Sequence, residues 1–169
     1  AYQAAADLMR GKKVAFVGSS RASVEDNYLL TKLADATGGD VLGFVAHVQE
    51  GAGDDWLRTD DKAPNRVGCE RLGMTALDGK LFASQISGYD VLYVLEDDVV
   101  AAGLCSSDDL AGKSVILHHY NTDNQTLAAA DVTLPAAMIV ETVGTFVNVD
   151  GHAQRVVPCK AIRGVNRTL

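Results

Sequence analysis

The sequence predicts an α/β fold: an open, mostly parallel, doubly wound sheet with helices on both faces, plus a C-terminal β-hairpin. Continuous apolar runs such as 14–17 recur along the chain, and they are typical of strands covered on both faces. Helical stretches separate these runs, which indicates parallel strands joined by crossover helices. The right-handedness of such crossovers then places helices on both sides of the sheet. No linker or internal repeat divides the sequence, so we expect a single domain over residues 1–169.

Five segments are predicted to form the sheet, with parallel pairing and with the first four strands central and covered. They are 14–17, 41–46, 89–95, 114–118 and 132–134. Pro135 ends the last of them, because proline has no N–H to donate to a neighbouring strand.

Several stretches are predicted to be helical, and the best defined of them follows the first strand. Ser23 is a good N-cap, Glu25 and Asp26 lie in the first turn, and the glycine pair at 38–39 stops the helix. The others are 1–9, 64–72, 78–87, 107–111 and 122–130, the last capped by Asn121 or Thr122.

Residues 144–157 are predicted to form a β-hairpin extension. The side chains from 144 onward alternate between the two faces of a strand. The pair Asp150-Gly151 favours a tight two-residue turn, in which both central residues need positive φ.

Composition and charge exclude several classes of function. The net charge of −7 argues against nucleic acid, whose phosphates are neutralised by Lys and Arg, and against an anionic membrane surface. No apolar run approaches the ~20 residues that span a bilayer, and residues 1–10 lack the apolar core of a signal peptide. We therefore expect a cytoplasmic protein without direct membrane insertion.

The cysteines give no sign of a metal centre. Cys69, Cys105 and Cys159 are far apart, and no C-x-x-C pair exists. We interpret them as buried, reduced thiols, and we expect no cofactor, metal or iron–sulfur cluster to be bound by this chain alone.

The C-terminal third carries a family resemblance. Its matching residues are 130–137, Glu141, 144–146, Asn148, Asp150, Gly151 and 153–155. Upstream, 18–21 and 25–30 match an earlier segment of the same family, and 57–68 matches one of its branches. These segments resemble the second half of the molybdopterin oxidoreductase domain. The branch is the large iron–sulfur subunit of NADH-quinone oxidoreductase (respiratory complex I).

This resemblance implies a subunit domain of an electron-transfer assembly. In that subunit the region is often a scaffold without molybdenum cofactor, and the iron–sulfur clusters lie elsewhere in the assembly. The implied partners are other subunits or domains of the redox complex, which would hold the chain at the periphery of the inner membrane.

Two alternatives stay open beside it. One is a fragment of a molybdenum enzyme similar to formate dehydrogenase, which would bind half of a molybdopterin guanine dinucleotide. The resemblance gives that role to Gly18, Ser19, Ser20, Arg21, Asn121 and Thr122. The other is a plain α/β ligand-binding module.

The turn after the first strand is itself a candidate anion site. Backbone N–H groups and a helix dipole at this place can hold an anion, and Arg21 is suited to a bidentate phosphate contact. The G-x-G-x-x-G spacing is absent, however, and Glu25 and Asp26 occupy the favourable dipole positions. We therefore favour an ordinary strand-to-helix turn.

Glu96, Asp97 and Asp98 follow the third strand, on the ligand edge of such a sheet. Three carboxylates there would repel a pyrophosphate, although hard cations do accept such ligands. We favour a solvated acidic loop that caps the following turn.

The histidines suggest no joint site. His118 and His119 are adjacent in a strand and point to opposite faces, so we expect one buried and one half-exposed ring. His47 and His152 are isolated in the sequence.

Two segments are predicted to contact partners. The long irregular stretch 47–63 carries the only tryptophan, Trp56, beside Leu57, and aromatic anchors are enriched at interfaces. The hairpin offers Val147 and Val149 on a strand edge. The alternatives are that Trp56 pins its own loop and that the hairpin packs on its own domain.

Overall fold

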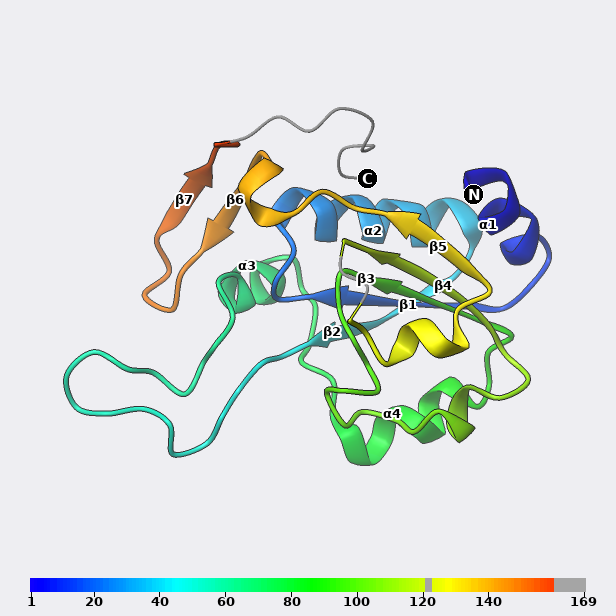
Figure 1. Cartoon of the computed structure of the whole chain (residues 1–169), viewed down its shortest axis with the longest axis horizontal. Coiled ribbons are helices and arrows are strands. Elements are labelled where there is room, and N and C mark those ends of the chain that lie inside the picture. The colour runs from blue at the N-terminus through cyan, green and yellow to red at the C-terminus, as the bar shows by residue number, and fades with distance from the viewer. Residues whose placement is uncertain (121–122, 160–169) are drawn as a thin grey trace.

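The computed structural model describes residues 1–120 and 123–159, and within them five strands form one parallel sheet (Figure 1). The order across the sheet is β2-β1-β3-β4-β5. The strands are β1 (Val14–Ser19), β2 (Asp40–Val45), β3 (Val91–Leu95), β4 (Ser114–His119) and β5 (Val132–Pro135). All four pairings between neighbours are parallel, so the predicted fold class and strand direction are confirmed.

β2 lies at an edge of the sheet, so the prediction that the first four strands are central is wrong for this strand. The chain turns back from β1 to one side for β2 and then crosses to the other side for β3. The outer edge of β2 is partly covered, because the Phe44 N–H donates to the Thr75 carbonyl at 3.0 Å. The Leu77 N–H donates back to the Phe44 carbonyl, also at 3.0 Å.

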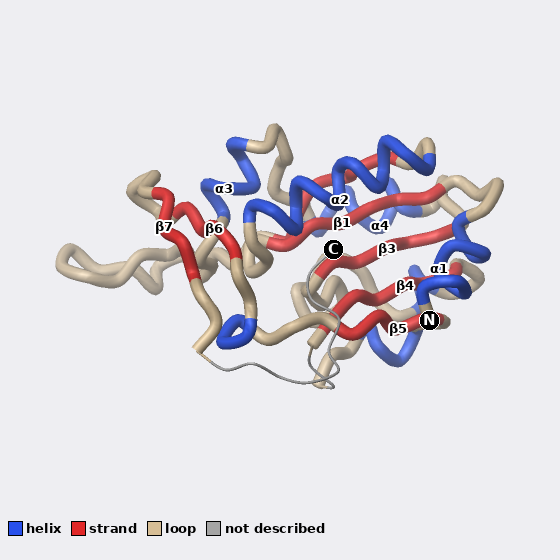
Figure 2. The backbone as a smooth tube through the Cα atoms, turned by 90° about the horizontal axis from the view of Figure 1, so that it is seen from above, coloured by secondary structure: helices blue, strands red, loops and turns tan. Residues whose placement is uncertain are grey.

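Helices cover both faces of the sheet, as predicted (Figures 1 and 2). On one face lie α1 (Tyr2–Met9) and α2 (Val24–Thr37), whose Ala5, Leu30 and Ala34 pack on Phe16, Tyr93 and Ile116. On the other face α4 (Gly79–Ile86) packs Phe82 and Ile86 on Val17, Leu92 and Leu117. The alternating side chains of β1 and β3 thus enter two separate apolar layers, which explains their unbroken apolar sequences.

The helices begin and end close to the predicted residues, with two exceptions. α2 has the predicted Ser23 cap, whose hydroxyl accepts from the Asp26 N–H at 3.1 Å, and it ends at Gly38 with φ of 68°. α3 (Arg66–Arg71) begins two residues after the predicted Pro64. Asn65 is at its N-cap position, but the Asn65 side chain bonds to Ala22 and Val147 and does not cap the helix.

The second exception is the predicted helix 122–130. In the described residues it is a 3-10 turn, η2 (Thr126–Ala129), and its predicted caps Asn121 and Thr122 lie outside the described residues. Two further 3-10 turns are η1 (Asp108–Leu110) and η3 (Ile139–Glu141). None of the helices in the described part has the length and apolarity that crossing a membrane requires.

The predicted hairpin is present, but its turn differs from the prediction. β6 (Gly144–Val147) pairs antiparallel with β7 (Ala153–Val156). The turn bond runs from the Gly151 N–H to the Asn148 carbonyl at 2.9 Å, and of the two expected turn residues only Gly151 has positive φ, at 84°. The Asn148 side-chain oxygen also accepts from the N–H groups of Asp150 and His152, which favours this longer loop over a two-residue turn.

The hairpin packs on its own domain through β6. Buried Asn65 links two parts of the chain: its amide nitrogen donates to the Ala22 carbonyl at 2.8 Å, and its oxygen accepts from the Val147 N–H at 2.9 Å. Glu25 accepts from both the N–H and the hydroxyl of Thr145 at 2.7 Å. β6 is thereby fixed to the start of α2, and the predicted packing of the hairpin on the domain is confirmed.

We predict that Asn65→Ala destabilises the domain, because it leaves the Ala22 carbonyl and the Val147 N–H without their partner. Each buried polar group left unsatisfied costs about 1–3 kcal/mol. Urea unfolding measures the free energy, and Gln154→Ala on exposed β7 is a matched control that is expected to change little. A loss for Asn65→Ala no larger than that of the control would contradict the role given to Asn65.

Candidate functional site

The carboxyl ends of β1 and β3 form the place where the strand order reverses. In open parallel sheets, ligands bind in the crevice outside the strands at this point. Here the chain places Ser19 at the end of β1, and Glu96, Asp97 and Asp98 directly after β3. This edge is therefore the first candidate for a functional site.

The turn that follows β1 has no free backbone donor between Ser19 and Ala22. Each of its four N–H groups donates to an acceptor within the domain. The pairs are Ser19 to the Asn27 side-chain oxygen at 3.1 Å, Ser20 to the Val45 carbonyl at 3.3 Å, Arg21 to the Ser19 hydroxyl at 3.0 Å, and Ala22 to the Ser19 carbonyl at 3.2 Å. A phosphate cradle needs such donors directed at the ligand, and this turn uses them itself.

Gly18 is required by packing inside the domain. A Cβ at this position would lie 2.5 Å from the Asn27 side-chain oxygen and 2.4 Å from the terminal carbon of Met74. Because Gly18 has no Cβ, the side-chain amide of Asn27 can lie close to the backbone of β1. Asn27 is fully buried, and the sequence prediction missed it because nothing local shows that its side chain turns back onto β1.

The hydroxyls of the turn are also bonded within the domain. Buried Ser20 donates to the Val45 carbonyl at 2.7 Å, and buried Ser19 donates to Asp97 Oδ2 at 2.6 Å. Arg21 alone among the predicted residues 18–21 is exposed. Asn121 and Thr122 lie outside the described residues, whereas nearby Asn124 donates to the Asp97 carbonyl at 3.0 Å.

Asp97 is the centre of a buried polar network. Its carboxylate accepts from the Ser19 hydroxyl and from the Asp98 N–H, and it lies 3.0 Å from His47 Nε2. The sequence prediction took His47 as isolated, but β2 carries it to the same edge as β3. The network links the ends of three strands, β1, β2 and β3.

The acidic triplet is not the solvated loop that the sequence predicted. Glu96 is 7% exposed and Asp97 1% exposed. Only Asp98 has the predicted capping role, since its carboxylate accepts from the N–H groups of Val100 and Ala101 at 3.2 and 2.9 Å. It also accepts from Thr126, so it joins the loop after β3 to η2.

Glu96 combines burial with an uncommon backbone conformation. Its φ is 47°, a left-handed value that a glutamate rarely adopts. Burial, and then the charges of Asp26 and Asp97, raise the pKa of its carboxyl to about 8. Burial also raises the pKa of Asp26, whose Oδ1 has no hydrogen-bond partner in the described part of the chain. Glu96 and Asp26 thus hold their protons more firmly than free carboxyl groups do, and this part of the site does not favour a negative ligand.

The histidines of β4 are divided between the faces as predicted. His118 is 2% exposed, and its Nδ1 lies 3.3 Å from the Tyr93 hydroxyl. Burial lowers the pKa of His118 to about 4, so the ring is neutral. His119 is partly exposed, and burial lowers its pKa as well. His152 is exposed on the hairpin loop.

The cysteines do not form a metal centre in the part of the chain that the structure covers. Burial raises the pKa of Cys69 to about 12 and that of Cys105 to about 11, which keeps both thiols protonated. Cys159 is exposed, so the prediction of a buried thiol is wrong for this residue. Across residues 1–120 and 123–159, no group of three or more His, Cys, Asp or Glu side chains is arranged to hold a metal ion.

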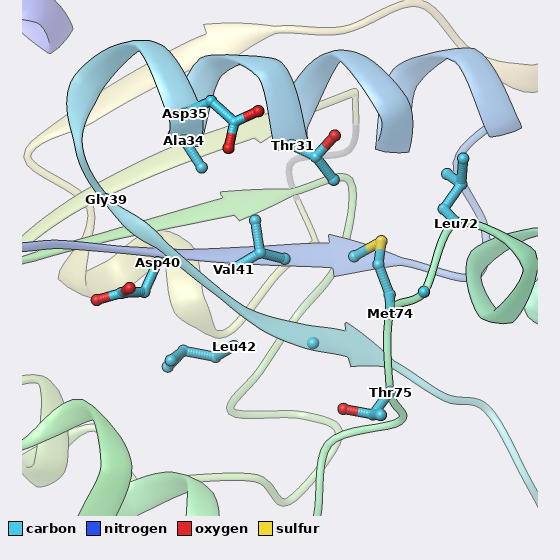
Figure 3. A pocket seen from close by; sticks show the side chains of 12 residues that line it. Thr31, Ala34, Asp35, Gly39, Asp40, Val41, Leu42, Leu72, Met74 and Thr75 are labelled. Atoms are coloured by element: carbon cyan, nitrogen blue, oxygen red, sulfur yellow. The ribbon is translucent and has the colours of Figure 1, made fainter.

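A cavity of about 320 Å³ lies along β2, the outermost strand on that side of the sheet (Figure 3). Thr31 and Asp35 of α2, Val41 and Leu42 of β2, and Met74 are among its lining residues. Of the residues that the sequence predicted for a ligand, the four that the structure describes, Gly18 to Arg21, do not line it. The predicted ligand edge and this hollow are therefore different places.

Part of this chain is similar to a known oxidoreductase subunit. No family profile matches the chain. A segment of 93 residues, 54% of the chain, is 33% identical to a subunit of the NADH-quinone oxidoreductase of Pseudomonas putida strain KT2440. That segment covers 10% of the relative, so the match spans about a tenth of its length.

We predict that Glu96→Gln stabilises the domain at pH 8 more than at pH 5. The pKa of Glu96 is raised on folding, so the folded state keeps a proton that the unfolded state loses above about 4.5. The stability of the unsubstituted domain therefore falls as the pH rises from about 4.5 to about 8.

The amide introduced by Glu96→Gln does not ionise, so the variant does not lose stability in this way as the pH rises. We expect its advantage in unfolding free energy to grow by about 1–3 kcal/mol between the two pH values. Urea unfolding at each pH measures it. An advantage that is equal at pH 5 and pH 8 would show that Glu96 is ionised in the folded domain.

Proposed function

We propose that this chain is a structural domain of an electron-transfer assembly of the NADH-quinone oxidoreductase type, without redox chemistry of its own. One observation carries the proposal: the turn that would hold a cofactor phosphate has all its N–H groups from Ser19 to Ala22 bonded within the domain. The similarity of 93 residues to a NADH-quinone oxidoreductase subunit supports the kind of assembly.

Electrostatics argue against the alternative, a molybdopterin guanine dinucleotide held at the same edge. Asp97 and Asp98 stand at the carboxyl end of β3, the edge at which its pyrophosphate would lie. At ~4 Å a like-charge pair costs about 1 kcal/mol in bulk water and more where water is excluded. Arg21 is the only basic side chain among the residues predicted to bind the dinucleotide.

In the proposed role the domain works through contacts with its neighbours. Iron–sulfur clusters would lie in other parts of the assembly, and the chain itself would hold no cofactor. The partners would be other subunits or domains of the complex, in the cytoplasm and peripheral to the inner membrane. The proposed contact residues are Trp56 and Leu57 on the long loop and Val149 on the hairpin, all of them exposed.

The structure changes one member of the predicted contact set. Val147 is 4% exposed and donates its N–H to Asn65, so its side chain faces the domain. Val149 is 48% exposed at the hairpin loop and stays in the set.

The purified chain tests the absence of a cofactor. We expect less than about one-tenth of an equivalent of iron or molybdenum per chain by elemental analysis, and no flavin band in the visible spectrum. GDP, which has the nucleotide end of the dinucleotide, is expected to leave the melting temperature unchanged, because a ligand raises it only by binding the folded state. Metal near one equivalent, or a saturable rise with GDP, would favour the molybdenum enzyme.

The assembly itself is tested with the polypeptide that carries this domain. Expressed with an affinity tag in its own host, it is expected to co-purify with NADH-oxidising activity and with the spectroscopic signals of iron–sulfur clusters. Isolation free of any redox subunit would contradict the proposed function.

A further inference from the structure

The loop between β2 and α3 presents two large apolar side chains to solvent. Trp56 is 93% exposed and Leu57 is 90% exposed. The loop projects from the same end of the domain as the hairpin β6–β7, and both views show it reaching beyond the sheet (Figures 1 and 2). The alternative that Trp56 pins its own loop is therefore wrong, because the indole packs on almost nothing in the domain.

The carboxylate of Asp54 holds the tip of this loop in shape. Asp54 Oδ1 accepts from the N–H groups of Trp56, Leu57 and Arg58 at 2.9, 2.7 and 2.9 Å. These hydrogen bonds lower the pKa of Asp54, which keeps the carboxylate ionised at neutral pH. The tip is thus formed before any partner binds.

The base of the loop is fixed in a similar way. The Asp60 carboxylate accepts from the N–H groups of Gly51 and Gly53 at 3.2 and 2.6 Å. The Lys62 N–H donates to the His47 carbonyl at 2.8 Å, which closes the loop where it leaves β2. A preformed loop loses little conformational entropy on binding, so the exposed indole is well placed to act as an anchor.

The surroundings of the indole are acidic. Residues 46–65, which join β2 to α3, contain five acidic residues and two basic residues, Arg58 and Lys62, which gives a net charge of −3. Asp61 is paired with Arg66 at 2.7 Å, whereas Glu50, nearer the base, and Asp55, at the tip, are exposed. A surface that accepts this tip must offer an apolar hollow for the side chains and positive charge around it.

We propose that Trp56 and Leu57 insert into an apolar pocket, rimmed by lysine or arginine side chains, on a neighbouring subunit of the same redox assembly. This inference rests on the proposed function, and it adds the chemistry of the partner. Complementary charge guides the encounter, and the buried indole supplies the affinity. A cation of the rim also gains from contact with the indole face.

A membrane surface is the alternative binding partner for the loop tip, and the negative charge of the loop disfavours it. Exposed Trp and Leu side chains are typical of membrane-interface anchors. The cytoplasmic leaflet is negatively charged, however, and it would repel a loop whose net charge is −3. A protein pocket with a basic rim satisfies both the apolar and the charged parts of the tip.

Trp56 is the only tryptophan in the chain, so its fluorescence reports the tip directly. In the isolated chain we expect the emission of a fully hydrated indole, quenched more strongly by cationic caesium than by anionic iodide. We expect no blue shift with phosphatidylserine–phosphatidylcholine vesicles or at increasing chain concentration. A blue shift with vesicles would assign the tip to a membrane, and one with concentration would assign it to a second copy; either overturns the proposal.

Cross-linking identifies the partner in the assembly. A photoreactive benzoylphenylalanine replaces Trp56 in the polypeptide that carries the domain, expressed in its own host. Position 81 is the matched control, because Leu81 is 55% exposed on α4 and lies away from the loop. We expect a cross-link from position 56 to another subunit of the redox assembly, in a peptide with apolar and basic residues, and none of comparable yield from position 81.

Charge reversal tests the basic rim. We expect Glu50→Lys with Asp55→Lys to lower the yield of the position-56 cross-link several-fold. Asp7→Lys with Asp35→Lys, on exposed sites of α1 and α2, changes the net charge equally and is expected to leave the yield unchanged. Equal yields in both pairs would contradict the basic rim.

The outcomes separate this inference from the proposed function. Co-purification with the redox subunits but no cross-link from position 56 would overturn the docking of Trp56 and leave the proposed function in place. A cross-link to a protein outside any redox assembly, without co-purification, would contradict both.

Discussion

The side chain of Asn27 is the contact on which the ligand edge of this sheet depends. Its amide nitrogen donates to the carbonyls of Ser19 and Ser23 at 2.9 Å, and its oxygen accepts from the Ser19 N–H at 3.1 Å. In related sheet topologies a ligand phosphate takes such N–H groups at the strand-to-helix turn. Here the buried Asn27 amide takes the first of these N–H groups, that of Ser19, and Gly18 gives it the space. The same turn carries Ala22, to which Asn65 and the hairpin are attached.

The charges at this edge follow from the same closure. The backbone N–H groups of the turn are already bonded inside the domain, so the turn does not require a negative ligand. Carboxylates can therefore stand beside it at the end of β3. Asp97 is stable there because Ser19, His47 and the Asp98 N–H surround it with hydrogen-bond partners. Glu96 lacks comparable bonds in the described residues, so burial raises its pKa instead. Contacts with other proteins are therefore better sought on the exposed loop and hairpin than at the ligand edge.

The sequence predicted those features that depend on local pattern. Apolar runs identify the strands, most clearly the unbroken ones in β1 and β3, and Ser23 identifies the start of α2. Strand order does not follow from such runs, because an edge strand such as β2 has the same apolar sequence when loops cover it. The burial of Glu96 and the pairing of His47 with Asp97 depend on tertiary contacts, which residue spacing does not encode. For Asn27 the one available signal is Gly18, whose missing Cβ indicates that some group lies close.

Amide hydrogen exchange tests most directly whether the turn after β1 is closed. We expect the N–H groups from Ser19 to Ala22 to exchange slowly, at rates close to those of β1, because each is bonded inside the domain. Added GDP is expected to leave these rates unchanged. Fast exchange of these amides in the free chain, together with slowing when GDP is added, would show an open phosphate cradle and contradict the structural role proposed for this domain.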